Sequence, residues 1–413
     1  MAIIGSIILA LLILTPIFNI SEVVSILSGN MEAFAGAGTP IYIKLIKDIG
    51  FLAIIAFSFL MALKNGRLRR LAILLVPMAA MVLAVFFISY KKDPLQAMAG
   101  LRWALPFIAA VLLTGNVEER LIFKIAKVLC AVFLVHVTLQ LYEHMITSML
   151  IKTYNPIPME FKPAGQHYFF ERLGKNLFGL RSPGIFMQPN TAGLFAIVSG
   201  FFAYFYLKRS VFRATALALL PLSILLCGSA TAMFTYILAA LCIFLLNKNT
   251  GSVSVKISVL LITVAILAAI GFNLRAVTGR VRIMYSAKER VDIFSNKLQH
   301  GELISTRFGK GTNSAALVTT KILKKDLPPI LESTVSEIIS NIGLIGFFAF
   351  AAGYLYWLVR TLRSGRADCI VFTLIYSIFF IASPVTESFP MNLLFAVGLA
   401  YFAPRILPRN KET

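Results

Sequence analysis

Charged residues are scarce in this chain. Only 14% of its 413 residues are Asp, Glu, Lys or Arg, while 58% are hydrophobic and the mean hydropathy is +0.84. Soluble domains carry about 25% charged residues, so this composition excludes an ordinary soluble globule and indicates a polytopic membrane protein. Acidic residues are the scarcest charge, with 18 against 39 Lys and Arg, which gives a net charge of +21.

Cysteine and histidine are also rare, with four residues of each. The cysteines (Cys130, Cys227, Cys242 and Cys369) lie in or beside apolar runs without metal-ligand spacing, so we predict buried thiols without disulfides. No GxxxxGK[ST], HExxH or GxGxxG motif is present, and no convincing internal repeat is visible. We therefore expect no metal, no cofactor and no nucleic-acid partner.

Long apolar runs are what the chain has in abundance. A membrane-spanning helix needs about 20 such residues. We predict an all-α polytopic membrane protein, with residues 1–413 forming a single integral membrane domain. The first run lacks the basic segment of a cleaved signal, so we expect it to be retained. Twelve spans are predicted, at 2–20, 43–63, 71–90, 95–114, 120–146, 191–207, 213–229, 230–247, 256–273, 334–359, 368–385 and 388–404.

Short basic loops predict the orientation of these spans. Segments 64–70, 208–213, 247–256 and 360–366, together with the C-terminal tail, fall on one side of the membrane in this count. Such loops are cytoplasmic, which places both termini in the cytoplasm. Two long loops, at about 146–190 and 274–333, then face outward.

The second long loop is strongly basic, with eleven Lys and Arg against five acids. It contains Arg290, His300, Arg307 and Lys310; Arg307 precedes the glycine-rich turn 308–317 and Lys310 lies within it. The loop suits either a solvated segment lying on anionic lipid or a pocket for an anionic substrate. The turn suits either close approach of backbone to a phosphate or an ordinary flexible connection.

Four of the polar residues inside predicted spans need an explanation. Arg102 should face a partner or cavity, or extend to the outer interface, because a charge at the centre of a span costs about 2.5–3.5 kcal/mol. His136, Gln140 and Glu143 are spaced to share one helix face near the outer end of the fifth span. This stripe fits the lining of an outer cavity and, equally, a set of hydrogen bonds between helices.

Residues 178–195, FGLRSPGIFMQPNTAGLF, interrupt the apolar pattern at the start of the sixth span. Pro189 favours an extended Gln188, and we predict Asn190 as the N-cap of the helix. Arg181 beside a helix N-terminus would form an anion site. The alternative is that Asn190 only caps the helix and Arg181 only meets a lipid phosphate.

Glu332 closes the second long loop just before the tenth span. A carboxylate at a helix N-terminus is stabilised by the helix dipole, which is a sufficient structural role. The functional alternative is a general base at the membrane surface.

Three short patterns together resemble the superfamily of O-antigen polymerases and O-antigen ligases. They are R-x-x-G-x-F-x-x-P-N (Arg181 to Asn190), F-G-x-G (Phe308 to Gly311), and a frame in which Glu332, Ser333 and nine further residues precede Gly343 and Gly346. The similarity covers about residues 95 to 405. Ligases have a His where this chain has Glu332, and this departure favours the polymerase branch.

The resemblance implies a glycosyltransferase of GT-C-like architecture in the bacterial inner membrane, with both long loops periplasmic. Its substrates would be undecaprenyl-pyrophosphate-linked glycans, used without a metal, and a chain-length regulator protein is a candidate partner. Arg181, Arg290 and Glu332 are then the expected catalytic residues, with Glu332 as the base. The expected substrate-binding residues are Arg102, Glu143, Gln188, Asn190, His300, Arg307 and Lys310.

The favoured function is polymerisation of lipid-linked repeat units into a surface polysaccharide such as O-antigen. One alternative is a ligase that transfers the finished glycan to the lipid A core. Another, from a different class, is a flippase for lipid-linked oligosaccharides, which should keep charged groups near the middle of the bilayer.

Overall fold

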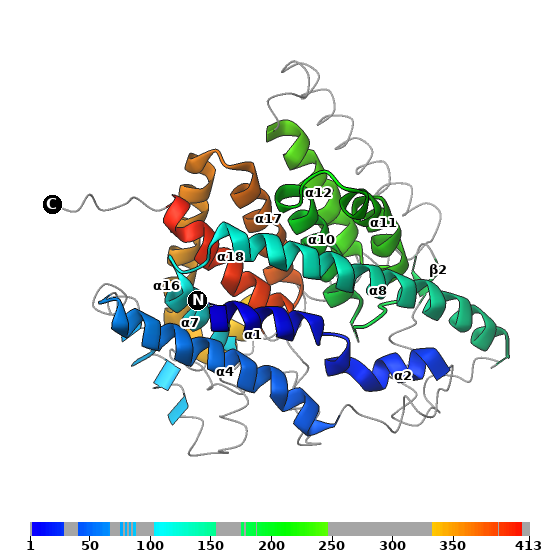
Figure 1. Cartoon of the computed structure of the whole chain (residues 1–413), viewed down its shortest axis with the longest axis horizontal. Helices are drawn as coiled ribbons and strands as arrows, with labels where there is room; N and C mark the ends of the chain where they lie inside the picture. The colour runs from blue at the N-terminus through cyan, green and yellow to red at the C-terminus, as the bar shows by residue number, and fades with distance from the viewer. Residues whose placement is uncertain are drawn as a thin grey trace.

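The computed structural model describes residues 2–28, 40–66, 75–76, 79–80, 82–83, 86–87, 103–153, 175–176, 179–186, 188–246, 333–386 and 388–406 (Figure 1). Its helices are α1 (Ala2–Ile13), the 3₁₀ turn η1 (Ile17–Asn19), α2 (Ile20–Ser28), α4 (Ile41–Lys64), α7 (Leu105–Leu113), α8 (Glu119–Thr153), α10 (Pro189–Tyr206), α11 (Val211–Cys227), α12 (Ala230–Leu246), α16 (Thr334–Ser364), α17 (Ala367–Ala382) and α18 (Met391–Ile406). Two short strands, β1 (Lys175–Asn176) and β2 (Gly179–Leu180), pair antiparallel with Lys175 opposite Leu180.

Most predicted spans that fall on described residues are confirmed as helices. The bounds of α4, α10, α11, α12, α17 and α18 lie within a few residues of the prediction. The prediction of one helix over 2–20 is wrong, because α1 ends before Pro16 and the chain continues through η1 into α2. Proline lacks an amide donor and clashes with the preceding turn, which explains the break. The span predicted at 256–273 lies outside the described residues, as does most of 71–90.

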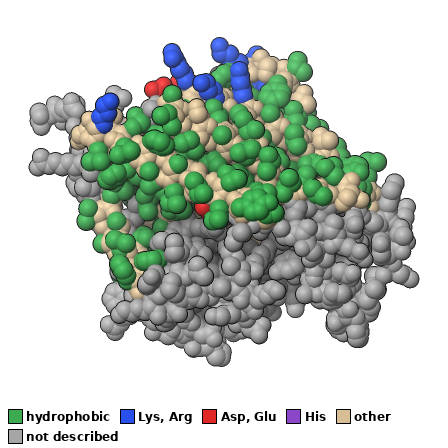
Figure 2. All heavy atoms as spheres, turned by 60° about the horizontal axis from the view of Figure 1, so that its bottom comes forward, with side chains coloured by type: hydrophobic (Ala, Val, Ile, Leu, Met, Phe, Trp, Pro, Cys, Tyr) green, Lys and Arg blue, Asp and Glu red, His purple; other side chains and the backbone are tan. Residues whose placement is uncertain are grey.

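Among the described residues, apolar length and composition identify three helical segments able to cross a membrane: Leu45–Lys64, Glu119–Ile146 and Asn341–Ser364. Shorter apolar helices accompany them, including α11, α12, α17 and α18. Figure 2 shows a broad hydrophobic surface on the described part of the molecule. These features indicate a helical membrane protein. Its described cysteines are free, as predicted: Cys130, Cys227 and Cys369 are buried, and Cys242 is partly buried.

Helix α10 lies at the centre of the helical packing and contacts α8, α11, α12 and α17 (Figure 1). Every residue from Thr191 to Ala203 is buried, as expected for a helix that is apolar all round. Glycines allow the close approach: a Cβ added to Gly193 would lie 2.3 Å from the Cβ of Ala232 on α12. Small residues at such crossings are typical of membrane helix packing.

The helices alternate in direction and so sort into two ends. At one end, which we call the signature end, lie the loop 181–188, the starts of α10, α12 and α16, and the last residues of α11 and α17. At the other, the basic end, the last turns of α10 and α18 meet the first turn of α17. The predicted basic loops 208–213 and 360–366 both fall at the basic end, and Figure 2 shows Lys and Arg side chains gathered along one edge.

Candidate functional site

The loop before α10 is hydrogen-bonded to the polar face of α8. The Gly184 amide donates to Glu143 Oε2 at 2.8 Å, and the Ile185 amide donates to His136 Nδ1 at 3.4 Å. Gln140 donates to the Ser182 carbonyl at 2.9 Å. The predicted shared face of His136, Gln140 and Glu143 is therefore confirmed, and all three side chains are buried. Of the two open interpretations, the structure supports the hydrogen-bond set.

Gly184 allows this loop to approach α8 closely. It has a φ of +59°, and an added Cβ would lie 2.7 Å from His136 Nδ1 and 2.9 Å from Gln140 Cγ. Both the backbone conformation and the space therefore require glycine. Phe186 secures the other side of the turn, with its ring 5.4 Å from that of His136 and 5.1 Å from that of Phe195.

Arg181 lies at the junction of this loop with the end of α11. Its neighbour Ser182 donates its amide to the Leu226 carbonyl at 2.8 Å, and Arg181 acts electrostatically on the thiol of Cys227, the last residue of α11. Arg181 is only half-buried. The R-x-x-G-x-F-x-x-P-N pattern thus places a guanidinium at the turn that leads from α11 into α12.

Asn190 is not the N-cap of α10, contrary to the prediction. Gln188 holds that position, with the extended backbone that Pro189 imposes (φ −110°, ψ 132°), and its side chain forms no capping bond. Asn190 instead lies in the first turn and joins helices. It accepts a 2.7 Å hydrogen bond from Ser229 Oγ and donates to the Ala382 carbonyl at 3.5 Å.

The same junction holds the starts of α12 and α16. Ser229 Oγ accepts from the Ala232 amide at 3.2 Å and so caps α12. Thr334, the first residue of α16, donates its hydroxyl to the Ser383 carbonyl and accepts from the Val385 amide, each at 2.9 Å. Three helix N-termini, those of α10, α12 and α16, therefore meet the turn after α17. Each N-terminus carries partial positive charge, which favours an anion nearby.

The predicted site residues are brought together only in part. Arg181, Gln188 and Asn190 lie at the signature end and are half-buried, whereas Glu143 is buried beneath the loop. Six predicted residues lie outside the described part of the chain: Arg102, Arg290, His300, Arg307, Lys310 and Glu332.

Sequence reasoning missed several residues that build the junction. Ser229 belongs to the small-residue stretch 228–232, which separates the seventh and eighth predicted spans. Serine is a preferred N-cap residue, so its position just before a predicted helix could have indicated this function. The pairing of Thr334 with the turn at Ser383 had no local signal, because the two residues are 49 positions apart.

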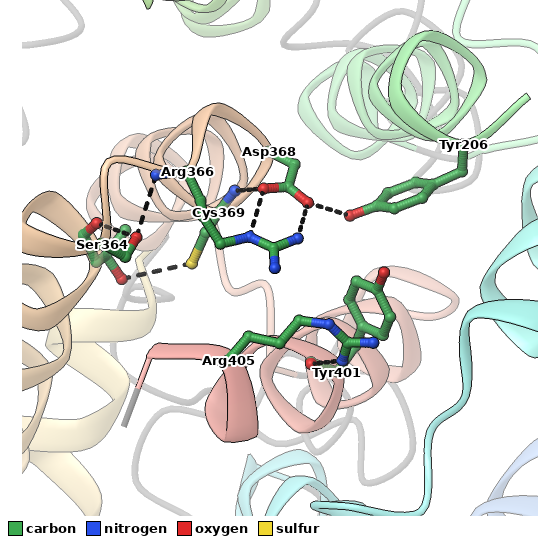
Figure 3. Close-up of polar contacts among 8 residues, drawn as sticks. Tyr206, Ser364, Arg366, Asp368, Cys369, Tyr401 and Arg405 are labelled. Carbon is green, nitrogen blue, oxygen red and sulfur yellow. Dashed lines mark hydrogen bonds and ion pairs between the residues drawn. The ribbon is translucent and has the colours of Figure 1, made fainter. Parts of the chain in front are cut away.

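A second polar cluster holds the basic end together (Figure 3). Arg366 and Asp368 form an ion pair of 2.7 Å, and the Tyr206 hydroxyl donates to Asp368 at 3.1 Å. The hydrogen bond to Asp368 raises the pKa of the Arg366 guanidinium above its ordinary value. Nearby, the Arg405 guanidinium lies 3.7 Å from the centre of the Tyr401 ring. This cluster joins α10, α17 and α18 and has an evident structural function.

The arrangement at the signature end can bind an anion through one guanidinium and helix N-termini. Within the described ranges, no group of three His, Cys, Asp or Glu side chains is placed to hold a metal ion. No protein-family model matches the chain, and no curated protein matches it.

Proposed function

We propose that the chain is a membrane glycosyltransferase that joins undecaprenyl-pyrophosphate-linked oligosaccharide repeat units into a polysaccharide and releases undecaprenyl pyrophosphate. The reaction would occur at the signature end, on the periplasmic face of the bacterial inner membrane, with both termini cytoplasmic. The observation that most supports this proposal is the meeting of Arg181 with the N-termini of α10 and α12 at the end opposite the basic loops.

The geometry suits a lipid pyrophosphate. Arg binds phosphate oxygens in a bidentate manner and stays charged. The start of α10 adds partial positive charge near Arg181, and the half-buried Gln188 adds an amide. Because charge grows on the leaving pyrophosphate in the transition state, cations fixed there lower the barrier. The apolar helix surfaces would leave the polyprenyl chain in the bilayer.

The remaining groups are assigned from the sequence. Glu332, two residues before Thr334, would take the proton of the acceptor hydroxyl. That oxygen would attack the anomeric carbon of the donor as the bond to the pyrophosphate oxygen breaks, with inversion. Arg290 and Arg307 would share the pyrophosphate charge with Arg181. Arg102, Lys310 and His300 would have supporting functions.

The alternatives differ in their support. A ligase would use the same donor and the same anion site, so only the acceptor distinguishes it from a polymerase. A flippase has less support, because the intramembrane polar stripe of His136, Gln140 and Glu143 is bonded to the loop before α10. In that position these three side chains support the loop before α10.

The direct test is a reaction of the purified, reconstituted protein with lipid-linked repeat units. We expect a ladder of products with new glycosidic bonds and free undecaprenyl pyrophosphate. Arg181→Ala and Glu332→Gln should abolish the ladder, while Arg209→Ala, which removes an exposed arginine beyond the end of α10, should retain it. Full-length polymer from both site variants would disprove the residue assignment, and lipid-linked substrate crossing the bilayer without new bonds would favour the flippase.

A further inference from the structure

A pocket of about 370 Å³ opens at the basic end, far along α10 from the junction at Arg181. It lies between the start of α8, which contributes Phe123 and Lys127, and the segment that joins α10 to α11. Leu207, Lys208 and Ser210 line it from that segment, and Phe212 lines it from the first turn of α11. Its volume is in the range of small-molecule and cofactor sites, about 300–1,000 Å³.

The lining is apolar inside and cationic at its rim. Phe123, Leu207 and Phe212 supply hydrocarbon surface, whereas Lys127 and Lys208 are exposed. The Lys127 ammonium lies 4.6 Å from the centre of the Phe123 ring, so its charge is held over the apolar wall. This combination matches a ligand with a negative head and a hydrocarbon tail.

The charged residues that line the pocket are of one sign. None of its lining residues is acidic, and neither lysine pairs with a carboxylate within the part of the chain that the structure describes. Glu119, one turn before Phe123 on α8, interacts electrostatically with Tyr401 of α18. Ser210 caps α11 by accepting from the Arg213 amide at 3.2 Å, so the positive end of the α11 dipole also adjoins the pocket.

Arg213 shapes the segment without occupying the pocket. Its guanidinium donates to the Leu207 carbonyl at 3.1 Å and lies 5.4 Å from the centre of the Tyr204 ring. The turn that carries Lys208 is therefore held in place by a neighbouring cation. Both lysines at the rim are exposed.

We propose that this pocket binds one anionic phospholipid of the leaflet that meets the basic end. Its phosphate would lie between Lys127 and Lys208, with the first part of an acyl chain against Phe123, Leu207 and Phe212. The apolar wall argues against a free phosphate, which would leave that surface exposed to water. The location at the end of apolar helices places the lysines where basic side chains meet anionic headgroups. The site is independent of the proposed reaction, which uses the opposite end.

The test titrates full-length protein in neutral detergent with phosphatidylglycerol and counts bound lipids by native mass spectrometry. The double variant Lys127→Ala/Lys208→Ala should weaken the tightest binding about tenfold, because each basic residue near a lipid surface contributes measurably to anionic lipid binding. The matched control Lys64→Ala/Lys124→Ala removes two exposed lysines of α4 and α8 that do not line the pocket and should bind as wild type. Phosphatidylcholine should bind the wild type more weakly.

A third variant tests the apolar wall. Phe212→Ser should weaken phosphatidylglycerol binding severalfold. It should leave binding of glycerol phosphate, the isolated headgroup, unchanged. Because Phe212 is partly exposed, we expect the variant to fold. Equal binding by the two double variants would overturn the proposal. So would glycerol phosphate binding as tightly as the whole lipid, or displacement of phosphatidylglycerol by a tighter-binding polyprenyl phosphate.

Discussion

Asn190 and Ser229 join the first turn of α10 to the start of α12 through a 2.7 Å hydrogen bond. The same asparagine donates to the Ala382 carbonyl of α17, so one side chain connects three helices. Ser182, which follows Arg181, is bonded to Leu226 only three positions before Ser229. The placement of Arg181 and the placement of the helix N-termini therefore depend on the same junction.

Replacing Asn190 or Ser229 with alanine should destabilise the protein by about 1–2 kcal/mol each, because each change leaves a partly or fully buried polar partner unsatisfied. The double variant should lose less than the sum, by about 0.5–1.5 kcal/mol, since both changes break one bond. Unfolding in a single detergent, followed by helical circular dichroism, measures these losses.

The control for this cycle pairs Asn190→Ala with Ser377→Ala. Ser377 bonds Tyr354 on α16 and shares neither of the hydrogen-bond partners of Asn190, so these two losses should add. Simple additivity in the Asn190 and Ser229 pair as well would mean that their hydrogen bond contributes nothing to stability.

Gly184→Ala should disturb the loop that carries Arg181 more than backbone strain alone requires. Gly66 provides the comparison: it has a similar positive φ, +63° against +59°, but has nothing within 4 Å of an added Cβ. Gly66→Ala should cost about 1–2 kcal/mol from the left-handed backbone. Gly184→Ala should cost about 1–3 kcal/mol more, because its Cβ would overlap His136 and Gln140.

The two Gly→Ala variants should also differ in the polymerisation assay. At equal amounts of folded protein, Gly184→Ala should lose most of the activity, because the displaced loop carries Arg181, and Gly66→Ala should keep it. If the two proteins were equally stable and equally active, the close contact with α8 would have no bearing on the site.

Two changes at the basic end should respond differently to salt. Tyr206→Phe removes the hydroxyl that bonds Asp368 and should cost about 1 kcal/mol at any ionic strength. Arg366→Ala should cost less than about 1 kcal/mol, and this loss should shrink at high salt, because the Arg366 side chain is 38% exposed. Thermal unfolding at low and high salt separates the two. A salt-independent loss of several kcal/mol for Arg366→Ala would contradict this ranking.

Local patterns were sufficient to predict much of the helical arrangement. Apolar run length located most described helices, and Pro189 correctly predicted the extended Gln188. Spacing of four and three residues placed His136, Gln140 and Glu143 on one face. Each of these features depends on neighbours within about one or two turns, so a single sequence carries the information.

Features that depend on distant partners could not be predicted in this way. Asparagine is a residue type common at helix N-caps, which is why Asn190 was predicted as one. Pro189 instead occupies the first helical position, so Gln188 is the N-cap. The Asn190 side chain then bonds Ser229, 39 positions away. The spacing of the polar stripe likewise indicated a shared face but not that residues 182–185 would cover it. The functions assigned to Arg102, Arg290, His300, Arg307, Lys310 and Glu332 stay predictions, as do the substrate-binding and catalytic functions assigned to Arg181, Glu143, Gln188 and Asn190.

Gly343 interrupts α16, where the sequence predicted one continuous span. Its φ of 72° and ψ of −175° lie in a region that is almost restricted to glycine, so Gly343→Ala should cost about 1–3 kcal/mol. Gly353, in the helical part of α16, has open space around an added Cβ, and Gly353→Ala should be neutral or stabilising by up to about 1 kcal/mol. Unfolding of the two variants in one detergent gives the comparison.

Because the break sets the direction of the turns that begin at Thr334, Gly343→Ala should also reduce polymer formation per folded molecule. A Gly343→Ala protein as stable and active as Gly353→Ala would show that α16 functions equally well as a straight helix.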